Sequence, residues 1–250
     1  MHRLLLLPLV ASLFCSCSSV GVYSLRPQGV AVRQAPSRIW VQPFVTPMSA
    51  LRLGERSPAE MQTLRAEIVR TLARETASQL RTHAANSSVL SSSSQLQPGS
   101  WLIRGQINLI DQGNRAKRAA IGLGAGRTEM RTTVVVEQVT TKGLLPLLRF
   151  NTTGSSGLEP GAAFAVATGG VGTAASAAAT AGSLVMRSLP GVNTDIDRTS
   201  YEIAAVLSLY LQRNGLLDSS RVAILPNMKG QLPSTLNLSR AIPGPLRPQN

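Results

Sequence analysis

The residues best suited to chemistry lie between positions 113 and 131. Glycines alternate with other residues there and cations surround them. Glycine leaves backbone amides uncovered, and together with nearby positive charge such amides can bind an anion. The same pattern also fits a wide turn that needs glycine dihedrals, with the arginine side chains in solvent. The candidate anion-binding residues are Arg115, Lys117, Arg118, Gly122, Gly124, Gly126, Arg127 and Arg131.

This stretch does not have the form of a nucleotide-binding loop. Neither Lys-Ser nor Lys-Thr follows the last glycine, as a Walker loop requires. We also expect the stretch to connect two strands rather than to open a helix, which excludes a dinucleotide fingerprint. An anion site and a structural turn remain the two interpretations.

Groups for catalysis are few. Outside the first residues the only histidine is His83, which we expect near the C-terminal end of a helix as a cation facing the dipole. Asp195 and Asp197 are expected to cap a helix that begins at residue 198. The sequence has no Gly-x-Ser-x-Gly elbow and no histidine–cysteine metal cluster. We therefore predict no enzymatic activity, no metal and no cofactor. A carboxylate mechanism would need acids distant in sequence to converge.

The N-terminus predicts export and lipidation. A short positive start precedes an apolar run over residues 4–14, which is too short to cross a bilayer and suits a signal peptide. The following Phe14-Cys15-Ser16-Cys17 resembles the lipobox of bacterial lipoproteins. Cys17 is the predicted acylation site, and palmitate is an acyl group of the expected kind. Cys15 is the alternative, although bulky Phe14 would then precede the cleaved bond, and an ordinary cleaved signal is the third interpretation.

These features predict the cellular location of the protein. Residues 1–16 are the predicted signal peptide, and residues 17–36 the lipidated N-terminus and tether. The resemblance to lipoproteins implies two or three acyl chains, which makes a stable anchor. No Asp follows Cys17, which by resemblance to enteric sorting signals favours the outer membrane. We expect a protein of the cell envelope that faces the periplasm.

Composition limits the partners. The chain has 25 Lys and Arg against 12 Asp and Glu, a net charge of +13, and a basic surface favours polyanions. For an exported chain these are anionic lipid head groups or acidic envelope polymers rather than nucleic acid. A diffuse charge that only aids solubility is the alternative. Cys15 and Cys17 are the only cysteines, so the folded region has no disulfide framework and no thiolate metal site.

Periodicity predicts an α+β domain over residues 37–225. Strands are expected at 38–45, 100–110, 130–140, 145–152 and 222–225. Helices are expected from the Ser57–Glu60 capping box to about residue 84 and over 198–214. The predicted fold is a mostly antiparallel sheet of about four to five strands, with two main helices on one face. The first helix should bury the stripe Met61, Leu64, Ile68, Leu72 and Leu80.

Two segments stand apart from this domain. Residues 160–187 form a Gly/Ala-rich insertion that carries no charge from 160 to 186. It could be a helix or hairpin packed on the sheet, a mobile insert, or a small-residue surface for membrane contact or self-association. Residues 226–250 contain five prolines and no long apolar run, and we expect a disordered tail.

Three quoted stretches carry a family resemblance. Residues 101–107 (Trp-Leu-Ile-Arg-Gly-Gln-Ile), 113–126 and 128–131 (Thr-Glu-Met-Arg) resemble the bacterial lipoprotein family called domain of unknown function 4410. The likeness covers about residues 36–215 and centres on Gly-x-Arg-x-x-Arg followed by Gly-x-Gly-x-Gly. It implies an exported, anchored domain with no established activity. The enlarged region 160–186 departs from the family pattern.

Two functions follow from these features. The first is a membrane-anchored, non-enzymatic envelope domain that binds a protein, an anionic lipid or an acidic polymer. The alternative is a structural or membrane-associated oligomer formed through residues 160–186. The sequence does not determine the oligomeric state.

Overall fold

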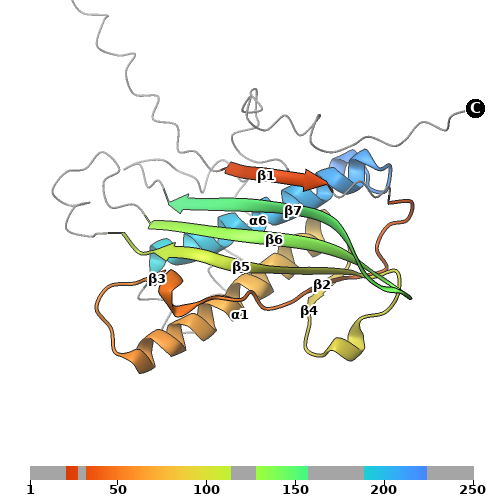
Figure 1. Cartoon of the computed structure of the whole chain (residues 1–250). Helices are drawn as coiled ribbons and strands as arrows, with labels where there is room; N and C mark the ends of the chain where they lie inside the picture. The colour runs from red at the N-terminus through yellow and green to blue at the C-terminus, as the bar shows by residue number, and fades with distance from the viewer. Residues whose placement is uncertain (1–20, 28–31, 114–127, 157–188, 224–250) are drawn as a thin grey trace, which may run out of the picture.

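The computed structural model describes residues 21–27, 32–113, 128–156 and 189–223. Its centre is one mixed sheet in which strands follow the order β1-β7-β6-β5-β2-β4, with β3 also paired to β5 (Figure 1). The strands are β1 (Gly21–Pro27), β2 (Ile39–Val41), β3 (Leu51–Arg52), β4 (Ser87–Val89), β5 (Trp101–Asp111), β6 (Thr128–Thr140) and β7 (Gly143–Ser156).

The long strands are antiparallel to one another. β6 pairs with β5 on one side and with β7 on the other, and β1 pairs antiparallel with β7. The short strands β2 and β3 run parallel to β5, and β4 runs parallel to β2. The predicted α+β class with a mostly antiparallel sheet is therefore confirmed.

Two long helices, α1 (Pro58–His83) and α6 (Pro190–Arg213), pack together on one face of the sheet (Figure 1). Short 3-10 turns occur at η1 (Met48–Ala50), η2 (Ser93–Gln95) and η4 (Ser219–Arg221). The predicted capping box begins α1: the Ser57 amide donates to Glu60 Oε2 at 2.8 Å, and the Glu60 amide donates to Ser57 Oγ at 3.3 Å. These bonds satisfy amides that the first helical turn leaves without partners.

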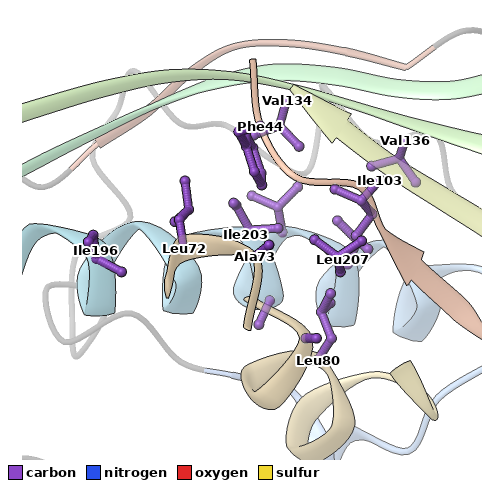
Figure 2. Close-up of a cluster of buried hydrophobic side chains, with 14 of the residues drawn as sticks. Phe44, Leu72, Ala73, Leu80, Ile103, Val134, Val136, Ile196, Ile203 and Leu207 are labelled. Atoms are coloured by element: carbon purple, nitrogen blue, oxygen red, sulfur yellow. The ribbon is translucent and has the colours of Figure 1, made fainter. Parts of the chain in front are cut away.

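The core fills the space between this helix pair and the sheet. Figure 2 shows strand side chains such as Ile103 and Val134 directed at Leu72 of α1 and Ile203 of α6, and all four are fully buried. The stripe expected on α1 is confirmed, with Met61 partly buried and the other four members buried.

A bulge changes the phase of β5. The pattern predicts Leu109 on the core face, but the register shifts between Ile107 and Leu109. As a result Ile110 is buried at 1% exposure, whereas Leu109 is only half-buried. An inserted residue in one strand moves every later side chain to the other face.

Two boundaries differ from the sequence prediction. The helix expected from residue 198 begins at Pro190, because Leu189, Val192 and Ile196 are fully buried and anchor two further turns. The segment expected to be a tether over 18–36 contains β1, whose backbone pairs with β7. Ile39–Val41 is the strand within the predicted range 38–45, and Val222 lies outside any strand.

Candidate functional site

The outer face of the long strands is the candidate site. Neither α1 nor α6 covers this face, because both helices pack on the other one (Figure 1). Strand alternation directs polar side chains outward from all three strands. They are Arg104, Gln106 and Asn108 of β5, Glu129, Arg131, Thr133 and Glu137 of β6, and Arg149 and Asn151 of β7.

A hydrogen-bonded ladder crosses this outer face. Asn108 Nδ2 donates to Thr133 Oγ1 at 2.8 Å, and that hydroxyl donates to Asn151 Oδ1 at 2.8 Å. The bonds hold side chains of three strands in fixed positions. The outer face therefore presents an ordered row of amide and hydroxyl groups.

Three arginines flank the ladder. Arg104 Nη2 contacts Glu137 Oε1 at 2.6 Å, and Arg131 Nε contacts Glu129 Oε1 at 2.6 Å. The Arg104 and Arg131 side chains remain 51% exposed. Arg149 is exposed, two strands from Arg104 in the same row of the sheet. Guanidinium groups oriented by carboxylates can donate several hydrogen bonds to an acidic ligand.

At the β2 end of the outer face the outward side chains are apolar rather than polar, and they form a cluster. Trp40, Leu102 and Val139 are buried there against Leu90 and Leu96. The Arg38 guanidinium lies 5.2 Å from the Trp40 ring centroid, a cation–π distance. The polar part of the outer face is thus the part that the segment around η2 leaves uncovered.

Of the predicted anion-binding residues, the structure describes Arg131. Arg115, Lys117, Arg118, Gly122, Gly124, Gly126 and Arg127 lie outside the described residues, as do Cys15, Cys17, the insertion 160–187 and the tail 226–250. The structure does describe the strand ends that flank residues 114–127, which we call the basic segment. Asp111 pairs with Glu129, and Thr128 pairs with Ser156.

The same end of the sheet connects to the Gly/Ala-rich insertion. Ser156 is the last described residue before it, and Leu189 is the first after it. Gly191, in the first turn of α6, packs directly on the Thr128 side chain. The basic segment and the insertion therefore leave the described structure from neighbouring positions, which we call the loop end of the sheet.

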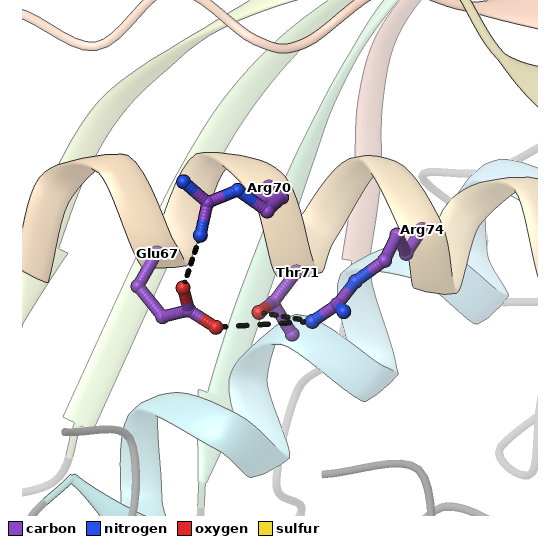
Figure 3. A network of polar contacts seen from close by, with 4 residues as sticks. All are labelled: Glu67, Arg70, Thr71 and Arg74. Carbon is purple, nitrogen blue, oxygen red and sulfur yellow. Dashed lines mark hydrogen bonds and ion pairs between the residues drawn. The ribbon is translucent and has the colours of Figure 1, made fainter. Parts of the chain in front are cut away.

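Helix α1 has its own local ion pairs. Glu67 Oε2 lies 2.6 Å from Arg70 Nη1, and Glu67 Oε1 lies 3.8 Å from Arg74 Nη2 (Figure 3). Arg74 also donates to Thr71 Oγ1 at 3.2 Å. Part of the positive charge of α1 is thus compensated on the helix itself.

The prediction that Asp195 and Asp197 cap a helix is wrong. Both lie inside α6, because the helix begins at Pro190, and Asp195 is 1% exposed. Glu202, two turns further along, is also 1% exposed, and its carboxylate oxygens accept no hydrogen bond from the described chain. Glu202 was not among the residues predicted from the sequence.

Burial changes the titration of these acids. It raises the pKa of Glu202 to about 8; Arg198 opposes this effect and Asp195 adds to it. Burial also raises the pKa of Asp197 to about 6, with a further contribution from Glu75 of α1. The pKa of Glu75 is itself raised by burial, against the lowering effect of Arg74 and Arg81. In each case burial shifts the carboxyl toward the protonated form relative to its ordinary pKa.

His83 occupies the predicted position at the end of α1. Its Nδ1 lies 3.3 Å from the carbonyl oxygen of Arg221, and its ring makes an edge contact with Tyr201 of α6 at 5.5 Å. Both contacts join the end of α1 to the C-terminal part of the described chain. They give His83 a structural role.

A shallow hollow of about 420 Å³ lies between the chain after β2 and helix α1. Its lining includes Phe44, Val45 and Val69, and Arg65 is the only ionisable residue in it. In the ranges that the structure describes, no three His, Cys, Asp or Glu residues are grouped to hold a metal ion. No described helix is long and apolar enough to cross a membrane.

Comparisons with known proteins identify a family. The model of the family described as Domain of unknown function (DUF4410) matches residues 39–173, just over half of the chain. The PelC dodecamer from Paraburkholderia phytofirmans is 10% identical with a TM-score of 0.36, over 55% of this chain and 81% of that one. The hypothetical protein CT253 from Chlamydia trachomatis is 14% identical with a TM-score of 0.36, over 68% of this chain and 98% of that one. No curated protein matches this chain. The matched family range runs from β2 past the end of β7.

Proposed function

We propose that this chain, which belongs to the family described as domain of unknown function DUF4410, is a lipid-anchored envelope domain that binds an anionic component of the envelope without catalysing a reaction. The anchor is Cys17, and the domain faces the periplasm from the outer membrane. The observation that carries the proposal is the outer face of the sheet, which the described helices do not cover, with its three arginines and its amide ladder.

The chemistry of this outer face suits an acidic ligand. Arginine binds carboxylate and phosphate groups with two parallel hydrogen bonds, and amides add donors and acceptors between the charges. Arg104 and Arg131 are each oriented by a glutamate. The segment 114–127, which joins the sheet beside Arg131, contains four cations and no acid.

The four acids that lie deepest in α6 or on the outer face favour binding over catalysis in this proposal. Asp195 and Glu202 are 1% exposed within the packing of α6, where a substrate in solution does not reach them. Glu129 and Glu137 are each engaged by an arginine. The hollow beside α1 contains no acid and no histidine in its lining.

The anchor is tested by metabolic labelling of the full-length protein with a palmitate analogue. Cys17→Ser should abolish the label, whereas Cys15→Ser should retain it. Loss of the label in Cys15→Ser alone would move the anchor to Cys15. Label in neither wild type nor variants would refute the lipoprotein assignment.

Binding is tested by cross-linking the protein in living cells and identifying what is captured. Arg131→Ala combined with Arg149→Ala should abolish capture of the anionic component. Arg65→Ala combined with Arg81→Ala is the matched control, because these exposed arginines of α1 carry the same charge. Equal capture by both double variants would refute a site at the outer face, and Arg115→Ala combined with Arg118→Ala tests the predicted contribution of residues 114–127 in the same assay. Capture of this chain alone would favour self-association through residues 160–186.

A further inference from the structure

Charge is distributed unevenly over the outer face of the sheet. Toward the loop end, Arg131 is paired with Glu129, and Asp111 lies in register with Glu129, so acids outnumber cations among the described residues there. In the half nearer the β6–β7 turn, Arg104 and Arg149 share the face with one acid of the described chain. The positive charge of the described outer face is therefore concentrated in this turn half.

The two arginines of the turn half lie in one row across the strands. Val135 of β6 pairs with Arg104 on one side and with Arg149 on the other. Neighbouring strands are about 4.8 Å apart, so the Cα atoms of the two arginines are about 10 Å apart. Arg26 of β1 is the backbone partner of Arg149 on its other side. This arginine row of four strands contains no acid.

Arg104 and Arg149 differ in their partners. Arg104 donates from Nη2 to Glu137 Oε1 at 2.6 Å, and the Glu137 side chain is only 6% exposed. This contact orients the guanidinium and leaves its remaining N–H groups for a ligand. Arg149 is exposed, and no acid of the described chain pairs with it. The row can thus bind two carboxylates about 10 Å apart.

The amide ladder lies in the neighbouring row. Gln106, Thr133 and Asn151 are each two residues from the arginine row along their strands, which is about 7 Å on the same face. Within the ladder, Asn108 uses an amide N–H and Asn151 uses its carbonyl oxygen. The Asn108 carbonyl oxygen and the Asn151 amide N–H groups are left for a ligand. The ladder therefore offers both acceptors and donors beside the cations.

The two rows together discriminate between classes of polyanion. Phosphates and carboxylates only accept hydrogen bonds, whereas a sugar hydroxyl both donates and accepts them. An extended peptide that adds to a sheet needs a free strand edge, but β5, β6 and β7 each pair on both sides (Figure 1). Single-stranded nucleic acid stacks its bases on aromatic rings, and the described side chains of the turn half expose none. A polysaccharide with carboxylates matches both rows.

We propose, on the basis of the anionic ligand in the proposed function, that the outer face binds a polysaccharide whose sugars carry carboxylates. The arginine row binds the carboxylates, and the ladder amides together with Gln106 bind the hydroxyls. The polymer lies across the strands, because the two described guanidinium groups are on different strands of one row. Arg131 contributes little, because Glu129 and Asp111 offset its charge.

The test uses the full-length protein in a non-ionic detergent and polygalacturonate, which carries a carboxylate on each sugar, as the probe. Arg149→Ala should weaken binding at least about tenfold, because a charge-assisted contact is lost. Arg131→Ala is the matched control, since it removes an exposed arginine from the same face, and should leave binding near the wild-type value. Both side chains are exposed, so the urea midpoint should not change. Equal weakening by the two substitutions would overturn the assignment to the arginine row.

Two related polymers test the sugar chemistry. Methyl-esterified polygalacturonate keeps the hydroxyls without the charge, and polyglutamate keeps the carboxylates without the hydroxyls. Both should bind more weakly than polygalacturonate. Thr133→Val removes the central hydroxyl of the ladder at nearly constant shape; it should weaken binding of polygalacturonate at least about threefold and leave binding of polyglutamate unchanged. Equal binding of polyglutamate and polygalacturonate by the wild type would overturn the sugar as ligand.

The cross-linking experiment in cells separates this inference from the proposed function. A protein that captures an anionic component in cells but does not bind polygalacturonate keeps the proposed function and overturns the carboxylated polysaccharide. A protein that captures no anionic component in cells and binds none of the polymers fails both.

Discussion

Glu202→Gln should make the stability of the domain much less dependent on pH. Glu202 is 1% exposed on α6, and its pKa is raised by burial from 4.5 to about 8. A raised carboxyl pKa means that the fold favours the protonated form. Its contribution to stability is fully present below the unfolded pKa of 4.5 and is lost as pH rises toward about 8.

The size of the effect follows from these two pKa values. Between pH 6 and pH 8 the unfolded chain is ionised at Glu202 and the folded chain mostly is not. Linkage then lowers the free energy of unfolding by about 1 kcal/mol per pH unit, or about 2 kcal/mol over the interval. Asp197 acts in the same direction, but most of its loss occurs below its folded pKa of about 6. The interval from pH 6 to pH 8 therefore isolates Glu202.

Urea denaturation at pH 6, 7 and 8 measures this quantity, with the combined fluorescence of buried Trp40 and Trp101 as the reporter. Wild type should lose about 2 kcal/mol over the interval and Glu202→Gln much less. The comparison uses the slope of the free energy of unfolding against pH. The cost of burying the glutamine amide in Glu202→Gln is the same at each pH and therefore cancels. Glu55→Gln, at an exposed position before α1, is the control and should keep the wild-type slope. A Glu202→Gln slope equal to that of wild type would refute the reasoning.

Three further substitutions test the fold and the outer face by urea denaturation at pH 7. Gly105→Ala should cost at least about 1–3 kcal/mol, because a Cβ there would overlap the backbone carbonyl oxygen of Thr133 on β6 and would lie 2.7 Å from the Phe44 ring; a neutral effect would mean that both the strand pair and the ring can shift. Arg104→Ala should cost about 1–3 kcal/mol, because it removes the ion-pair partner of nearly buried Glu137; a similar cost for Arg104→Ala in a Glu137→Gln background would show that the pair is not the cause. Ser57→Ala should cost about 1 kcal/mol through loss of the capping box, and no loss would show that water replaces the hydroxyl.

The sequence predicted those elements whose signals are local. The capping box at Ser57 and the apolar stripe from Leu64 to Leu80 specify α1 without any partner. Alternation likewise identified β5, and the Val- and Thr-rich composition of residues 130–140 identified β6. The phase of β5 after the bulge could not be read in this way, because a bulge leaves no clear mark in the apolar pattern.

The candidate site was predicted only in part. Arg131 was recognised from the glycine-rich motif, whereas Arg104 and Arg149 belong to the same outer face only through strand pairing. The sequence does contain a pattern that indicates burial of Glu202, although it was not used for a prediction. It lies seven residues after Asp195, and therefore on the same side of the helix, within the apolar sequence that continues to Leu211.

The first turns of α6 show why the loop end of the sheet was the hardest part to predict. Gly191, Asn193 and Thr194 are poor helix formers, and the local sequence favours a start at a later residue. The helix forms there because Leu189, Val192 and Ile196 are buried. It also packs so closely on the sheet that two glycines are needed at the contact.

Those glycines couple the helix to the strands that flank the basic segment. A Cβ on Gly154 of β7 would lie 2.9 Å from the Asp195 carbonyl oxygen, and a Cβ on Gly191 would meet the Thr128 side chain. Thr128 is the first residue of β6 after the basic segment, and Gly154 precedes the insertion by a few residues. The position of both connections therefore depends on how α6 is seated. Since α6 also carries Asp195 and Glu202 in its buried surface, the geometry of the loop end depends on buried residues of the helix as well as on the strands.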